Sequence, residues 1–284
     1  MASLKNTLLP RSLRIGIKNW AKGRWRNGLQ KGAPWVGVAH SAINNHEREI
    51  ISQHGEDGIL AHLVRALDLG ARPFLEIGFH PAEANLIHHA LRNPGQGTFV
   101  DANARGCALA ERVFRRSGPA NYRILNRRVT PDTINALVLE AGGTNLGILS
   151  LDVDSIDYWI WKALEVARPP LVVLEYNGAL GPTRMATFPL IHRPVADGQN
   201  PLFHGASLAA LTQLAQNKGY RLIGCETSGV NAFYLRAGEL EETYPTLTPE
   251  EAFFWPDHLF ERGLTADSLA AEISGLPFEE IALE

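Results

Sequence analysis

The chain has 284 residues, and its hydrophobic content of 45% is enough for one large domain with a buried core. Its net charge of −3 is uneven, because residues 1–32 hold eight Lys and Arg and no acid, so the rest carries −11, which excludes a nucleic-acid-binding body. The two cysteines, Cys107 and Cys225, lie far apart, which excludes a disulfide framework or a cysteine zinc motif and favours a cytoplasmic location.

Residues 1–32 have the pattern of a basic amphipathic helix. At about 100° per residue, apolar side chains fall on one face and Lys and Arg on the opposite face. Such a helix favours contact with a membrane surface that carries anionic lipids, which would place the protein at the periphery of a membrane. A disordered tail, a helix packed on another subunit of a homo-oligomer and an organelle transit peptide are the alternatives. No apolar run approaches the ~20 residues of a membrane span.

After a predicted linker at 33–46, the chain alternates between strand-like and helix-like patterns of apolar residues. The segment 52–58 leads into an apolar stripe at helical spacing, and strand and helix signals then follow one another. Strands are expected at 73–79, 96–101, 122–129, 146–154 and 170–177, and helices at 82–92, 104–116, from Thr130 onward and at 156–166. This alternation predicts an α/β fold, in which helices cover both faces of a parallel sheet.

The chain becomes less regular after the fifth strand. Residues 178–204 contain four prolines and no clear period, which is typical of a functional or disordered loop. We expect next a helix at 208–217 capped by Ser207, then an antiparallel hairpin of 219–226 with 231–236 at the sheet edge. The remainder is acidic and mostly helical, with helix starts at Thr248 and Thr265. The predicted division is a basic segment with linker (1–46), an α/β domain (47–240) and a C-terminal extension (241–284).

Polar residues follow the predicted strands at their carboxyl ends, where ligands bind in such sheets. They are Glu76 and Gly78 after the first strand, Asp101 and Asn103 after the second, Asp152 and Asp154 after the fourth, and Glu175 and Asn177 after the fifth. An acid that closes the second strand is placed to bind ribose hydroxyls. No GxGxxG loop follows the first strand, and this argues against a pyrophosphate cofactor such as NAD.

Three acids, Asp152, Asp154 and Asp157, lie within six positions after the run Ile148–Leu151. Carboxylates this close repel one another, so a cation, hydrogen bonds or solvation must offset the repulsion. A ligand site is one interpretation. One helix cap with two solvated loop acids is the other.

Several segments together resemble the FkbM-like branch of class I S-adenosylmethionine-dependent methyltransferases. The matching pieces are SQHGEDGIL at 52–60, FLEIG at 74–78, Asn85, GTFVDAN at 97–103, LSLDVDSIDYWIW at 149–161, VVLEYNGALGP at 172–182 and GYRLIGCETSGVNAFYLR at 219–236. The resemblance implies a seven-stranded sheet with an antiparallel terminal hairpin and S-adenosylmethionine as cofactor. It also implies that Glu76, Gly78, Asn85 and Gln53 surround the methionine part, and that Asp101, followed by Asn103, binds the ribose. The chain departs from the pattern at His80-Pro81, where more glycines are usual.

A second analogy concerns metal. Some class I O-methyltransferases bind a divalent cation through an acid after the fourth strand and an acid–Asn pair after the fifth. Here Asp152, Glu175 and Asn177 would supply these ligands, with Asp154 or Asp157 helping. Their oxygen atoms favour Mg²⁺ or Mn²⁺. The alternative is that Glu175 and Asn177 bond to backbone and line a pocket without metal.

The candidate general base is His204, in the segment PLFHGAS, because a neutral imidazole can take a proton from a hydroxyl. Asp154 and Asp157 complete the predicted catalytic group. A surface histidine is the competing interpretation.

These observations predict an O-methyltransferase that acts on a sugar, glycan or small-molecule hydroxyl. Two other classes stay open, a non-catalytic binding subunit of a membrane-associated glycan assembly and a metal-dependent enzyme that uses Asp152, Asp154 and Asp157.

Overall fold

The structure is a computed structural model that describes residues 41–81, 84–190, 200–261 and 263–282. The chain divides into two units, 1–36 and 37–284, and all described residues belong to the second. The basic segment 1–32, its predicted membrane contact and most of the predicted linker lie outside the described residues. Within the described part, no helix has both the length and the hydrophobicity to cross a bilayer.

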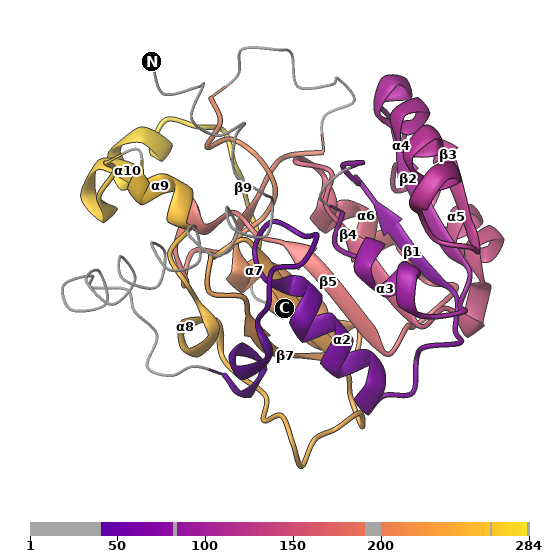
Figure 1. The fold of residues 1–284 in the computed structure, drawn as a ribbon. Coiled ribbons are helices and arrows are strands. Elements are labelled where there is room, and N and C mark those ends of the chain that lie inside the picture. Colours follow the sequence, from indigo (N-terminus) through magenta and orange to yellow (C-terminus); the bar gives the residue numbers. More distant parts are fainter. Residues whose placement is uncertain (1–40, 82–83, 191–199, 262, 283–284) are drawn as a thin grey trace, which may run out of the picture. The chain divides into compact units, whose positions relative to one another are not determined.

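A seven-stranded sheet forms the centre of the second unit (Figure 1). In spatial order its strands are β3 (Tyr122–Asn126), β2 (Gly97–Asp101), β1 (Phe74–Ile77), β4 (Ile148–Leu151), β5 (Leu171–Glu175), β8 (Asn231–Arg236) and β7 (Tyr220–Cys225). The first five are mutually parallel, and β8 runs antiparallel to both β5 and β7. The predicted α/β fold with an antiparallel terminal hairpin is therefore confirmed.

The order of the strands reverses next to β1. The chain adds β2 and β3 on one side of β1 and then crosses over to add β4 and β5 on the other side. In open α/β sheets, ligands bind outside the carboxyl ends of the strands at such a point.

Helices cover both faces of the sheet. On one face α2 (Glu56–Ala66), α3 (Ile87–Arg92) and α4 (Ala104–Ser117) pack on apolar side chains such as Phe74 and Phe99. On the other face α5 (Ile134–Ala141), α6 (Asp157–Ala163) and α7 (Leu208–Asn217) enclose a second core around Trp161 and Tyr234. Strands β1 and β4 are buried at every position, as expected for strands covered on both sides.

Local capping places several helices where the sequence predicts them. Ser207 accepts a hydrogen bond from the Ala210 N–H at the start of α7. Thr248 and Thr265 cap α8 (Pro249–Ala252) and α10 (Ala266–Ile273) in the same way. The predicted starts of all three helices are confirmed.

Other boundaries were predicted wrongly, and side-chain hydrogen bonds explain two of them. The helix predicted over 82–92 begins at Ile87, because the N–H groups of Asn85 and Leu86 donate to the Glu76 carboxylate. The helix predicted over 156–166 ends at Ala163, since the N–H groups of the next turn donate to Asn135 Oδ1. The helix expected from Thr130 begins at Ile134, and the strand expected over 122–129 ends at Asn126.

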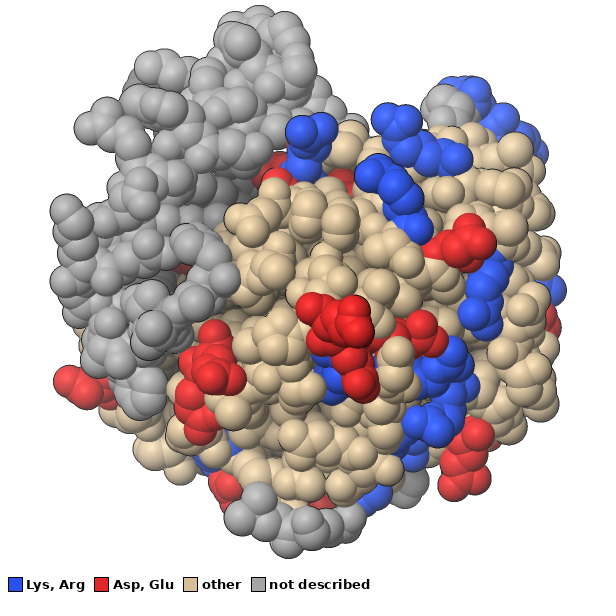
Figure 2. Space-filling model, turned by 90° about the horizontal axis from the view of Figure 1, so that it is seen from below, with Lys and Arg blue, Asp and Glu red and all other residues tan. Residues whose placement is uncertain are grey.

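The segment 178–204 contacts the C-terminal extension. A short strand, β6 (Ala186–Thr187), pairs with β9 (Glu279–Glu280), and Arg184 forms an ion pair with Glu280 at 2.6 Å. A third apolar cluster joins Phe188 and Phe203 of this segment to residues of α9 (Asp257–Glu261) and α10. The C-terminal helices therefore pack against the described parts of this segment, 178–190 and 200–204. On the face shown in Figure 2, acidic and basic side chains are interspersed over the surface.

Candidate functional site

The loops after β1 and β4 touch at Gly78. Its φ of +82° lies in the left-handed region, and a Cβ at this position would overlap the carbonyl oxygen of Asp152. Only glycine fits both conditions. The close approach brings the loop after β1, from Gly78 onward (the cofactor loop), directly against the loop after β4, residues 152–156 (the acid-rich loop).

Glu76 organises the cofactor loop from inside the protein. Its buried carboxylate accepts hydrogen bonds from Asn85 N at 2.7 Å and Leu86 N at 2.8 Å. Burial raises the pKa of Glu76 to about 8, although both hydrogen bonds lower it. The Asn85 side chain donates to Ser150 Oγ on β4 at 3.3 Å. Glu76, Gly78 and Asn85, three predicted cofactor residues, thus lie together.

Asp101 closes β2 as predicted. It accepts a hydrogen bond from Asn103 N, and Asn103 in turn caps α4 by accepting from Arg105 N and Gly106 N. Burial and the nearby Asp154 raise the pKa of Asp101, and Asn103 N–H and His80 lower it. The side-chain oxygen of Asn103 is therefore used by the helix terminus, and Asp101 faces the acid-rich loop.

Gln53 is exposed in the turn before α2, a turn that Asp57 holds in place. Asp57 Oδ2 accepts hydrogen bonds from the N–H groups of Ile50, Ile51 and Ser52. Sequence reasoning missed this buried acid. The available signal was the acid pair Glu56-Asp57, followed at once by an apolar helix stripe, because a carboxylate there is free to bind the preceding loop.

Asp157 has a local role in the structure. Its buried carboxylate accepts from Val153 N at 2.7 Å and Ser155 N at 3.1 Å, which closes the acid-rich loop onto the start of α6. Burial raises its pKa to about 6. Both oxygens thus bind backbone of the loop before α6, and Asp157 does not cap the helix, whose N-cap residue is Ile156 without a side-chain cap bond. Its catalytic role stays a prediction.

Asp152 and Glu175 share a hydrogen bond between their carboxyl groups. Burial raises the pKa of each well above the ordinary range. Charge repulsion raises both pKa values further, chiefly from Asp154 in the case of Asp152 and from Asp152 in the case of Glu175. Each carboxyl of the pair is therefore protonated more readily than an isolated acid.

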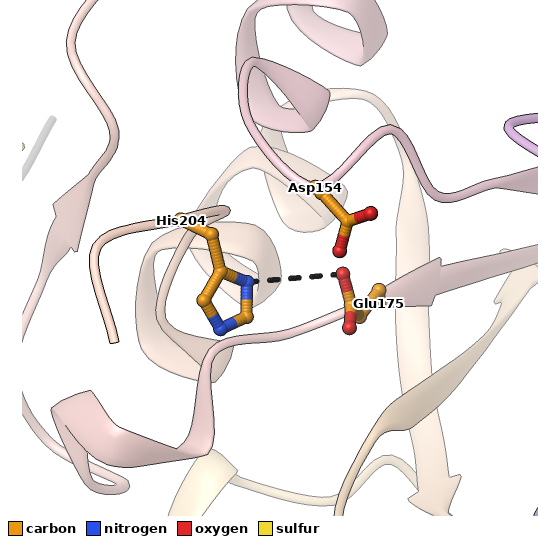
Figure 3. A group of neighbouring side chains, drawn as sticks. All are labelled: Asp154, Glu175 and His204. Atoms are coloured by element: carbon orange, nitrogen blue, oxygen red, sulfur yellow. Dashed lines mark ion pairs between the residues drawn. The ribbon is translucent and has the colours of Figure 1, made fainter. Parts of the chain in front are cut away.

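A group of three side chains converges beside this pair (Figure 3). Asp154 comes from the loop after β4, Glu175 from the end of β5, and His204 from the segment before α7. One ligand atom from each lies within 4.8 Å of the others, and His204 Nδ1 is 3.9 Å from Glu175 Oε2. Asp154 has a left-handed backbone, with φ of +55°. Burial lowers the pKa of His204, so its imidazole is neutral near pH 7.

Asn177 holds His204 in this position. Its amide nitrogen donates to the carbonyl oxygens of Leu202 and His204, both at 2.8 Å, and its Oδ1 accepts from Ala179 N at 3.0 Å. The predicted metal ligands were Asp152, Glu175 and Asn177. The structure instead brings together Asp154, Glu175 and His204, with Asp152 behind Glu175 and Asn177 bonded to backbone.

A small cavity adjoins the group. It has a volume of about 10 Å³ for the centre of a water molecule, which is room for roughly one water. Glu175 and His204 line one side, and Pro256 and His258 of the C-terminal extension line another. The extension therefore forms part of the wall beside the candidate site.

No protein-family model matches the chain, and no curated protein matches it. Solved structures that resemble it include proteins named as methyltransferases. Magnesium protoporphyrin IX methyltransferase from Synechocystis PCC 6803 with bound SAM is 12% identical, with 64% of this chain and 78% of that chain covered and a TM-score of 0.41. The N-terminal domain of EvdMO1, in the presence of SAH and D-fucose, is 14% identical over 76% and 96%, with a TM-score of 0.45. The O-methyltransferase from Bacillus cereus in complex with SAH is 15% identical over 67% and 83%, with a TM-score of 0.41.

Proposed function

We propose that the protein transfers a methyl group from S-adenosylmethionine to a hydroxyl oxygen of a sugar, glycan or small molecule. The observation that carries this proposal is the set of polar side chains at the carboxyl ends of the strands, where the strand order reverses next to β1. An acid at the end of β2, Asp101, lies near a group able to activate a hydroxyl, Asp154 with Glu175 and His204. The loop after β1 has no run of glycines for phosphates.

The cofactor residues are assigned by the resemblance to FkbM-like enzymes. Glu76, Gly78 and Asn85 bind around the methionine part, with Gln53 in the adjacent turn. Asp101 accepts hydrogen bonds from the ribose hydroxyls, and Asn103 supports it through its backbone N–H. Glu76 is already bonded to two backbone N–H groups, so its main contribution is to shape the loop.

The reaction needs little covalent chemistry from the protein. The cofactor supplies an electrophilic methyl group, the methyl–sulfur bond breaks as the methyl–oxygen bond forms, and the hydroxyl proton leaves. The protein aligns the two reactants and receives the proton. His204 is the predicted base, since its neutral imidazole can accept that proton, and the neighbouring Asp154 stabilises the imidazolium that results. The covered segment 178–190 and α9 would border the acceptor.

One observation favours a second candidate, a binding module without catalysis. In the loop after β1, Phe79 is only 4% exposed and packs against Phe99 in the core, and Pro81 is buried, so the loop holds side chains where the resemblance implies glycines. A protein of this kind would bind its ligand through the same sheet edge but would not bind S-adenosylmethionine. A metal-dependent enzyme is the third class, distinguished by cation binding without cofactor binding.

Titration calorimetry with S-adenosylmethionine and S-adenosylhomocysteine tests the proposal. We expect binding by the full chain that is lost in Asp101→Ala. The matched control is Asp132→Ala, an exposed acid before α5 that lies outside the site and should leave the affinity unchanged. If neither ligand binds to a folded chain, with or without Mg²⁺, the methyltransferase proposal is wrong and the binding module takes its place.

A further inference from the structure

The geometry points to a divalent-cation site formed by Asp154, Glu175 and His204. Three segments that are distant in the sequence supply one ligand atom each, and these atoms lie within 4.8 Å of one another. Figure 3 shows the three side chains directed toward a common point from three sides. Ligand atoms on one ion lie about 3–3.5 Å apart when the metal bonds are about 2.0–2.2 Å long, so the three side chains would close on the ion by roughly 0.5–1.5 Å.

Two of the three ligand atoms lack any other partner. Glu175 Oε2 and His204 Nδ1 each expose less than 1 Å² to solvent and accept or donate no hydrogen bond. Their separation of 3.9 Å is too long for a hydrogen bond to each other. Buried polar atoms are rarely left unsatisfied, so each such atom calls for an explanation. A cation between them would satisfy both at once.

The negative charges around Asp154, Glu175 and His204 also favour a bound cation. Asp152, Asp154 and Glu175 are close enough to repel one another. Within the described residues, no Lys or Arg forms an ion pair with any of these acids. A divalent cation would supply the missing countercharge.

The surroundings also resemble the outer shell of a metal site. Metal ligands are usually held by a further hydrogen bond, which fixes their orientation. Asn177 donates to the carbonyl oxygens of Leu202 and His204, both at 2.8 Å. Asn177, which analogy assigned as a ligand, therefore positions the segment that carries His204.

The donor set indicates which cation binds. Two carboxylates suit Mg²⁺ and Mn²⁺, whereas an imidazole nitrogen favours a first-row transition metal over Mg²⁺. The combination is best matched by Mn²⁺ or a similar divalent ion. Three protein ligands leave coordination positions open for a substrate oxygen. His204 would then be a ligand and not the base; a cation here would lower the pKa of the acceptor hydroxyl, and the hydroxyl proton would pass to solvent water.

This inference rests on the proposed methyl transfer for its chemical purpose, but cation binding is measurable without cofactor or acceptor. The full chain is first freed of metal with EDTA and dialysed, and Mn²⁺ is then titrated while the electron paramagnetic resonance signal of free Mn²⁺ is recorded. We expect one bound ion per chain and a higher melting temperature with Mn²⁺ than without it. Calorimetry with S-adenosylmethionine in EDTA reports separately on the cofactor site.

Three substitutions identify the ligands. Asp154→Asn, Glu175→Gln and His204→Ala should each weaken Mn²⁺ binding by about tenfold or more, by analogy with losses at other metal sites. Asp132→Asn should leave it unchanged. Because Asp154 is exposed, its variant should fold normally even if the other two do not. No Mn²⁺ binding by the folded chain, or binding that all three substitutions leave intact, would overturn the inference.

Discussion

The substitution Gly78→Ala tests whether the contact between the β1 and β4 loops holds the site together. Gly78 has a φ of +82°, and a Cβ built there overlaps the Asp152 carbonyl oxygen and lies 3.2 Å from Val153 N. Both neighbours are main-chain atoms, so no side-chain rotation relieves the overlap. The backbone of one loop must move.

Two contributions set the size of the effect. A left-handed conformation costs an L-residue about 1–2 kcal/mol relative to glycine. Displacement of packed backbone adds about 1–3 kcal/mol, as for an overpacked core. The expected loss is therefore about 2–5 kcal/mol of unfolding free energy, a large share of the about 5–15 kcal/mol available to a typical domain. The shift also displaces Asp152 and Asp154, so binding of both cofactor and cation should weaken.

Urea unfolding of the variant and of Gly238→Ala measures the two contributions separately. Gly238 has a φ of +94°, and a Cβ at this position would have no atom within 4 Å, so its variant incurs the conformational cost alone. We expect Gly78→Ala to lose clearly more stability than Gly238→Ala. Equal losses would refute the idea that the loop contact is tight.

Three further substitutions test the buried acids and a buried hydroxyl. Burial raises the pKa of Glu76 from 4.5 to about 8, so the stability that its protonated form contributes is complete below pH 4.5 and is lost as the pH rises to 8. The loss is at most about 4–5 kcal/mol. In Glu76→Gln, the urea midpoint should therefore depend less on pH between pH 6 and pH 9 than it does in the parent protein. Asp157→Ala leaves two N–H groups of its loop without acceptors and should cost about 2 kcal/mol, against almost nothing for Asp132→Ala. Tyr176→Phe removes a hydroxyl that donates to the Phe254 carbonyl oxygen at 2.8 Å, and thermal unfolding should show a loss of about 1 kcal/mol; an unchanged melting temperature would mean that this bond is not formed in solution.

The fold was predictable because its signals are local. A buried parallel strand needs an apolar run and a covering helix needs an apolar stripe, and both patterns are visible in the sequence around Ile148–Leu151 and Leu208–Asn217. Boundaries failed where a distant side chain competes for backbone N–H groups, as Glu76 does at the start of α3. The strands β6 and β9 have two residues each and lie far apart in the sequence. Segments this short have no side-chain pattern from which their pairing could be predicted.

The site was predictable in place but not in composition. Parallel strands end at one edge of a sheet, so the acids after β1, β2, β4 and β5 had to gather there. Which of them face each other depends on residues beyond the strand ends, where alternation of side chains no longer applies. Asp154 turns through a left-handed conformation, and Asn177 folds back onto the His204 backbone. Neither the Asp154 backbone conformation nor the Asn177 hydrogen bond can be predicted from residue spacing.

The hydrogen bonds of the buried acids separate structural from functional ones. Asp57, Glu76 and Asp157 each accept two or three backbone N–H bonds from a loop that has no regular pairing of its own, so their carboxylates replace the missing secondary structure. Glu175 Oε2 and His204 Nδ1 are buried without such partners. Other buried polar atoms, Asp57 Oδ1 among them, also have no hydrogen bond, but Glu175 Oε2 and His204 Nδ1 converge with a third ligand atom of Asp154. Their unmet bonding capacity is therefore best explained by a ligand that binds between them.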